Sequence, residues 1–105
     1  MNIELLKKIS KRSDHKSFHH AVLVLKSGAL LAQGYNVRYR HAEIMALEKL
    51  WPSKRMGTTI ISFMVRKSGS FGNSFPCDDC WRYLVENKVS KIIYYDGKEW
   101  IQERI

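Results

Sequence analysis

Two short motifs bring together residue types that can bind a metal and move protons. The first is His41-x-Glu43, and the second is Pro76-Cys77-x-x-Cys80. One imidazole and two thiolates are a typical catalytic zinc set, in which the protein supplies three ligands and water takes the fourth position. The sequence therefore predicts His41, Cys77 and Cys80 as the ligands of Zn²⁺.

Glu43 follows the predicted ligand His41 by two residues, so its carboxylate can lie beside the metal without binding it. Zinc lowers the pKa of a bound water to roughly 7. A nearby carboxylate can take the proton of that water, protonate a ring nitrogen and then protonate leaving ammonia. Hydrolytic deamination needs these three transfers, and the two motifs together are a signature of zinc deaminases. We therefore expect Glu43 to be catalytic.

The joint presence of both motifs is specific. From average residue usage, His-x-Glu arises by chance in about one chain in ten of this length, and Pro-Cys-x-x-Cys in on the order of one in a thousand. A redox pair or half of a structural zinc site are the alternatives for the cysteines. A redox pair leaves His-x-Glu unexplained, and a closed structural site needs a fourth ligand, for which His15, His19 and His20 are the remaining histidines.

The segments around the motifs favour an α/β domain. Apolar spacing, helix formers and a helix-starting proline predict helices over residues 2–12, 41–50 and 76–87. Apolar, β-branched runs bounded by turn signals predict strands over residues 19–25, 29–35, 58–65, 91–95 and 98–105. Residues 67–75, rich in glycine and serine, are expected to form a loop. This order predicts a mixed sheet with helices packed on it.

On these motifs and this order of elements, the chain resembles the cytidine deaminase superfamily from about His20 to Gly97. The resemblance implies a cytidine deaminase-like three-layer α/β fold. Its five-stranded mixed sheet would carry helices on both faces, with the two zinc-bearing helices on one of them. We expect residues 1–105 to form a single zinc-dependent deaminase domain.

Contacts to the substrate are predicted at five positions. The resemblance implies that Asn36 contacts the sugar or base, although a simple turn residue is the alternative. It also implies that the backbone N–H groups of Ala42 and Cys77 orient the base and the attacking water. Phe71 or Phe75 could stack on the base, because stacking on aromatic rings is a usual way to hold one. Either phenylalanine could equally belong to the core.

Two departures from the commonest family pattern concern the substrate. The approach to the cysteine motif, residues 66–75, is long and basic, which resembles uncharacterised CMP/dCMP-type members. The Asp96-Gly97 turn predicts a tight hairpin between the last two strands, as in the free cytidine and blasticidin deaminases. Arg38, Arg40 and Arg66 could face a phosphate, or serve only solubility.

The net charge and the cysteine content indicate the partners and the location of the protein. The chain carries 18 Lys and Arg against 10 Asp and Glu, a formal net charge of +8, which favours a phosphate-bearing partner and leaves nucleic acid possible. Its two cysteines, with neither an apolar leader nor a membrane-spanning stretch, predict a soluble, intracellular, cytoplasmic protein that does not use a membrane. So small a domain would gain from burial between subunits, and we expect a homo-oligomer.

The sequence therefore predicts a hydrolase of nucleotide metabolism. Its expected reaction converts a free cytosine nucleoside or nucleotide to the uracil form and releases ammonia. One alternative is a deaminase acting on cytosine, or less readily adenine, in single-stranded DNA or RNA, which the net charge of +8 would favour. Another is a catalytically silent zinc domain that binds nucleic acid or protein.

Overall fold

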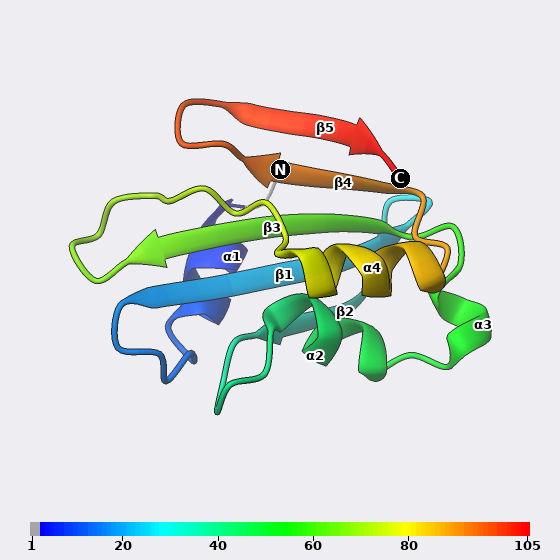
Figure 1. The fold of residues 1–105 in the computed structure, drawn as a ribbon, viewed down its shortest axis with the longest axis horizontal. Coiled ribbons are helices and arrows are strands. Elements are labelled where there is room, and N and C mark those ends of the chain that lie inside the picture. Colours follow the sequence, from blue (N-terminus) through cyan, green and yellow to red (C-terminus); the bar gives the residue numbers. More distant parts are fainter. Residues whose placement is uncertain (1–2) are drawn as a thin grey trace.

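The centre of the molecule is a five-stranded sheet in the order β2-β1-β3-β4-β5 (Figure 1). It is seen in a computed structural model that describes residues 3–105. The strands are β1 (Phe18–Lys26), β2 (Ala29–Tyr35), β3 (Thr59–Arg66), β4 (Lys91–Tyr95) and β5 (Trp100–Arg104). The β3–β4 pair is parallel, and the other neighbouring pairs are antiparallel. The sheet is therefore mixed, as predicted.

Helices cover both faces of the sheet, which confirms the three-layer fold (Figure 1). Helix α1 (Ile3–Ser10) covers one face, while α2 (Ala42–Glu48) and α4 (Asp78–Glu86) cover the other. A short helix, α3 (Pro52–Arg55), follows α2. Within residues 3–105, no helix is both long and apolar enough to cross a membrane.

The helices are shorter than the sequence predicted. The first expected helix began at residue 2, which lies outside the described residues, and it ends at Ser10 rather than at residue 12. The second ends at Glu48, and Pro52 then opens α3, which the sequence analysis did not predict. Proline is suited to the first turn of a helix because the N–H that it lacks has no intrahelical partner there.

Helix α2 lies very close to strand β2 at Gly34. A Cβ atom built on Gly34 would lie 2.5 Å from the carbonyl oxygen of Ala42 and 2.7 Å from the backbone nitrogen of Ala46. Only a residue without a side chain permits this approach of strand and helix. Gly34 therefore sets the position of the first turn of α2, which carries Glu43.

The loop at residues 67–75 folds back along β3 before it reaches the cysteine motif. The nitrogen of Gly72 donates to the carbonyl of Met64 at 3.0 Å, and Phe71 forms an isolated bridge with Val65. Further on, the nitrogen of Ser74 donates to the carbonyl of Tyr95 at 2.8 Å. The predicted loop is thus held between β3 and β4 close to the start of α4.

Candidate metal centre

The three predicted zinc ligands come together at the starts of two helices. His41 precedes α2 and Cys77 precedes α4, and both have extended backbone angles typical of a helix-capping residue. One ligand atom from each of His41, Cys77 and Cys80 can be chosen so that all lie within 4.8 Å of one another. The sequence prediction that helix α4 begins at residue 76 is wrong by two residues, because Cys77 is extended.

The separation of the ligand atoms of His41 and Cys77 suits a zinc ion. The Sγ of Cys77 lies 3.7 Å from the Nδ1 of His41. Around a tetrahedral zinc with bonds of about 2.0–2.3 Å, neighbouring ligand atoms lie about 3.3–3.8 Å apart. His41 and Cys77 are exposed, whereas Cys80 is buried. The cluster thus has one side toward solvent, which a catalytic metal requires for its water.

The Cys80 thiol needs a nearby positive charge to become a thiolate. Burial of the thiol, and then the negative charge of Glu43, raise the pKa of Cys80 far above its ordinary value. A divalent cation reverses this tendency, since a coordinating thiol loses its proton. The donor set and its electrostatics therefore fit Zn²⁺.

Glu43 lies in the first turn of α2 with its side chain 1% exposed. Its negative charge contributes to the raised pKa of the Cys80 thiol. Within the described residues, its Oε1 has no hydrogen bond of ordinary geometry. Burying a carboxylate is costly unless neighbouring groups compensate its charge, so the position of Glu43 beside the metal cluster needs such groups.

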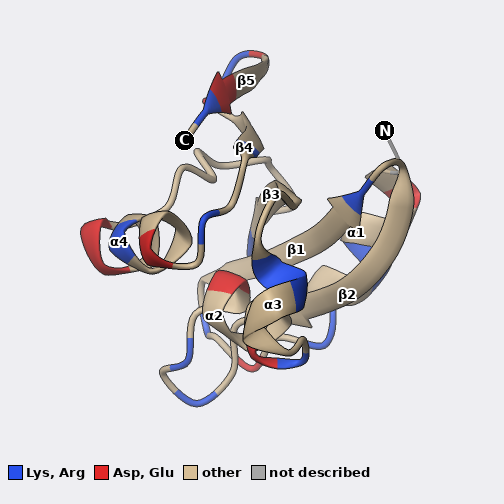
Figure 2. Cartoon of the chain, turned by 90° about the vertical axis from the view of Figure 1, so that its right-hand side faces the viewer, with Lys and Arg blue, Asp and Glu red and all other residues tan. Residues whose placement is uncertain are grey.

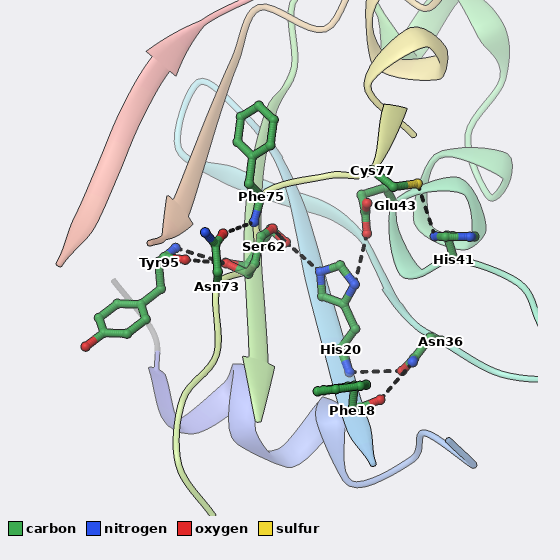
Figure 3. A network of polar contacts seen from close by, with 11 residues as sticks. Phe18, His20, Asn36, His41, Glu43, Ser62, Asn73, Phe75, Cys77 and Tyr95 are labelled. Carbon is green, nitrogen blue, oxygen red and sulfur yellow. Dashed lines mark hydrogen bonds and ion pairs between the residues drawn. The ribbon is translucent and has the colours of Figure 1, made fainter. Parts of the chain in front are cut away.

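Beside Oε1 of Glu43 lies a histidine that the sequence analysis considered only as a possible fourth ligand of a structural zinc site. The Nδ1 of His20, on β1, lies 3.2 Å from that oxygen. On its other side, the Nε2 of His20 lies 2.6 Å from the Oγ of Ser62 on β3. Figure 3 shows the imidazole between the carboxylate and the serine.

Asn36 is held by the backbone of β1. Its Oδ1 accepts from the nitrogen of His20 at 2.9 Å, and its Nδ2 donates to the carbonyl of Phe18 at 2.9 Å (Figure 3). Both ends of the amide are therefore engaged in fixing the first residues of the strand. The predicted contact of Asn36 with a substrate stays a prediction.

The other predicted substrate residues lie in different places. Ala42 opens α2, with its side chain fully buried. Phe71 packs against Phe63, with ring centroids 4.8 Å apart, in the core cluster on the α1 face. Phe75 is 42% exposed and stacks on Trp81 at 5.3 Å, and its ring points away from His20 and Glu43 (Figure 3). The structure brings neither phenylalanine to the metal cluster.

A cavity of about 300 Å³ opens beside the cluster, which is near the lower end of the usual range for ligand pockets. Its walls come from the segment before β1 and from the loop between β2 and α2, and they comprise Asp14, His15, His20, Asn36, Val37, Arg38, Tyr39, Arg40 and His41. The loop is tightly turned, with positive φ of 48° at Arg38 and 69° at Tyr39. The backbone nitrogen of Arg38 donates to Asp14 at 3.1 Å.

The three arginines considered for phosphate binding have different surroundings. Arg40 forms an ion pair with Glu48, and Arg66 donates to the carbonyl of Phe71 in the hairpin that follows β3. Arg38 lines the cavity, and its guanidinium has no partner among residues 3–105. Arg38 is therefore the arginine best placed to receive an anion beside the cluster.

Basic residues are not gathered on one element. Figure 2 shows Lys and Arg positions on helix α3 and on several separate loops, while α4 has both acidic and basic positions. The first turn of α4 holds Asp78 and Asp79. The net charge of +8 is thus distributed over several parts of the molecule.

Comparison with known families agrees with the site. The family profile described as the cytidine and deoxycytidylate deaminase zinc-binding region matches residues 2–96. The chain belongs to this family. The match spans both motifs of the candidate metal centre, so the prediction of Zn²⁺ as cofactor is confirmed by the zinc-binding region and the His/Cys/Cys cluster together.

Solved structures share the fold of this family member. One is the dCMP deaminase from the cyanophage S-TIM5 in apo form, with a TM-score of 0.64 and 22% identity over 86% of this chain and 75% of that chain. Acinetobacter baumannii RibD, in forms 1 and 2, gives a TM-score of 0.63 and 18% identity over 86% of this chain and 25% of the RibD chain. None of the curated proteins compared with the chain matches it.

Proposed function

We propose that residues 1–105 form a single zinc-dependent deaminase domain acting on a free cytosine nucleoside or nucleotide. The product is the uracil form, and ammonia is released. The observation that carries the proposal is the buried carboxylate of Glu43, 1% exposed, beside a His/Cys/Cys cluster at the edge of a cavity. A zinc scaffold has no use for a buried carboxylate there, whereas deamination needs a proton carrier.

His41, Cys77 and Cys80 would hold the zinc. When bound, the metal supplies Lewis acidity, which lowers the pKa of a water to roughly 7. Glu43 takes the proton of the attacking water and gives it to the ring nitrogen next to the amino-bearing carbon. The water oxygen forms a bond to that carbon, the bond from carbon to the exocyclic nitrogen breaks, and Glu43 carries a second proton to the leaving ammonia.

The cavity supports a monomeric, phosphate-bearing substrate. Its volume is about 300 Å³, and its wall includes His15 and Arg38, whose guanidinium has no partner among residues 3–105. Guanidinium forks match phosphate oxygens well. The dispersed basic residues (Figure 2) give less support to a nucleic-acid groove. The fold similarity to the cyanophage dCMP deaminase points in the same direction.

The first test is a deamination screen of the zinc-loaded protein by mass spectrometry. Cytidine, deoxycytidine, CMP, dCMP, adenosine and single-stranded DNA and RNA oligomers are offered in parallel. Glu43→Gln should retain stoichiometric zinc and lose about 10²- to 10⁴-fold in kcat, the usual contribution of a positioned acid–base group. The control is Glu86→Gln on the exposed side of α4, which should leave turnover unchanged.

The same screen tests the substrate class. Arg38→Ala should lower kcat/KM for nucleotides by about tenfold or more, since a hydrogen bond to a charged group contributes about 1.5–3 kcal/mol. The kcat/KM for nucleosides should not change. Lys54→Ala on α3 removes a charge away from the cavity and serves as the control. Conversion of oligomers alone would replace this proposal with the nucleic-acid alternative. No conversion with full zinc would favour the silent zinc domain.

Two further predictions concern the assembly and the location of the protein. A homo-oligomer is supported by exposed apolar side chains, with Leu30 48% and Leu31 39% exposed on the edge strand β2 and Trp51 80% exposed. A cytoplasmic location stays a prediction.

A further inference from the structure

The buried carboxylate of Glu43 has a neighbouring group that could compensate its charge. Glu43 is buried, and among residues 3–105 its Oε1 lacks a hydrogen bond of ordinary geometry. The Nδ1 of His20 is 3.2 Å from that oxygen. Figure 3 shows Glu43 between His20 on one side and the His41–Cys77 pair on the other. The imidazole thus contacts the carboxylate from the side remote from the metal cluster.

The hydrogen bonds of Ser62 determine which ring nitrogen of His20 is the donor. The Oγ of Ser62 donates its single hydrogen to the carbonyl of Ser74 at 2.7 Å. At 2.6 Å from the Nε2 of His20, the same Oγ must therefore accept a hydrogen from that nitrogen. The Nδ1 is left facing Oε1 of Glu43 at 3.2 Å.

The backbone of His20 is also fixed. Asn36 accepts from its nitrogen and donates to the carbonyl of Phe18, which ties the start of β1 to the loop before α2. Ser62 is fixed in turn, because Ser74 donates from its own Oγ to the carbonyl of Ser62 at 2.7 Å. The imidazole is therefore constrained at its backbone and at its outer nitrogen, so its remaining nitrogen presents a fixed point to Glu43.

We propose that His20 is a positioning residue for Glu43. It holds Oε1 of the carboxylate, so that the other oxygen stays directed toward the attacking water and the base. This inference rests on the proposed function, since the orientation of Glu43 matters for a proton carrier. An apolar side chain at position 20, like that of Val22 two residues further along the same face of β1, could fill the space. It could not hold the carboxylate.

Two variants separate the two contacts of the imidazole. In His20→Asn the amide nitrogen can take the place of Nδ1 and keep the contact with Glu43, while the contact with Ser62 is lost. In His20→Gln the amide reaches toward Ser62 and the contact with Glu43 is lost. We expect His20→Gln to lose about 10- to 100-fold in kcat, the usual cost of removing a group that orients an active-site ligand, with KM changed little. His20→Asn should recover much of this loss.

A double variant tests whether His20 acts through Glu43. In a Glu43→Gln background, adding His20→Gln should cause no further loss of kcat, because the carboxylate to be positioned is gone. His19→Gln is the matched control, since its side chain alternates to the other face of β1. Zinc content and the unfolding midpoint are measured for every variant. An equal loss in His20→Asn and His20→Gln, or an additive double variant, would overturn the proposal.

A measurement without turnover separates this inference from the proposed function. The side-chain ¹⁵N shifts of His20 in the zinc-loaded protein should report a protonated Nε2, and Glu43→Gln should move the Nδ1 resonance. Glu48→Gln, on the same helix but paired with Arg40, should not move it. An Nδ1 resonance insensitive to Glu43→Gln would refute the contact. If the resonance moves but no substrate is converted, the contact stands and the proposed function fails.

Discussion

The two faces of the sheet bury different kinds of side chain. Under α1, the core is apolar and rich in aromatic rings, with Phe63 in edge contact with Phe71 at 4.8 Å and stacked near Trp100 at 6.1 Å. Under α2 and α4, apolar side chains occupy one part of the face, and the polar group of His20, Ser62 and Glu43 occupies another.

Strand alternation produces this division. Successive residues of a strand point to opposite faces, so Val22 and Ile60 face α2 and α4 while Leu23 and Ile61 face α1. His20 and Ser62 continue the first series toward the end of the sheet where α2 and α4 begin. Most of the aromatic packing therefore lies on one face and the chemistry on the other, and mutations should affect them separately.

The largest expected effect on stability comes from the α1 face. Phe63 is fully buried, and Phe63→Ala should lower the free energy of unfolding by about 3–5 kcal/mol because it leaves a cavity in the aromatic cluster. The folded fraction should bind zinc as tightly as the wild type. Urea unfolding and a zinc competition assay at low temperature measure the two quantities. A parallel loss of zinc affinity would show that the faces are coupled.

A smaller change in stability on the other face should have a larger effect on the site. Gly34→Ala forces a Cβ to within 2.5 Å of the backbone of α2, which should cost about 1–3 kcal/mol as overpacking and displace His41 and Glu43. Zinc affinity and kcat should both fall. The control is Gly72→Ala, whose Cβ would meet the flexible ends of two side chains, Met64 at 2.6 Å and Arg66 at 3.5 Å. Equal effects of the two variants would contradict this interpretation.

The smallest effect is expected at the β4–β5 hairpin, outside the metal site. Backbone hydrogen bonds from Glu99 and then Lys98 lower the pKa of Asp96 below its usual 3.8. The stabilisation of the turn is therefore present above pH 3.8 and is lost as the pH falls through the lowered pKa. Amide exchange of β5 should accelerate in that acid range, and Asp96→Ala should abolish this step while leaving zinc binding at neutral pH unchanged.

Much of the fold and the metal cluster could be predicted from the sequence because they depend on local signals. The strands follow apolar runs bounded by turn signals, and the motifs around His41 and Cys77 stand at helix starts, so their roles follow from spacing. Helix α3 was missed because the helix predicted over residues 41–50 ends just before Pro52, and no separate helix was assigned to this proline. In fact it both follows that helix and opens the next one.

The role of His20 could not be predicted because both faces of β1 are covered. Residues 21–24 are all buried, so the strand shows no alternation of polar and apolar residues to indicate which face a side chain takes. His19 and His20 are therefore equivalent by pattern. The contact with Ser62 depends on the register of β1 with β3, and this pairing joins residues about 40 positions apart.

Ser74 fastens the chain to both neighbouring strands immediately before the cysteine motif. It exchanges hydrogen bonds with Ser62 on β3 and with the backbone of Tyr95 on β4. A change in the length of the preceding hairpin should consequently leave the thiols of Cys77 and Cys80 in place. The turn at residues 67–70 is thus a graft site, where a tag or a new substrate-gripping segment can be inserted without moving Cys77 out of register with His41.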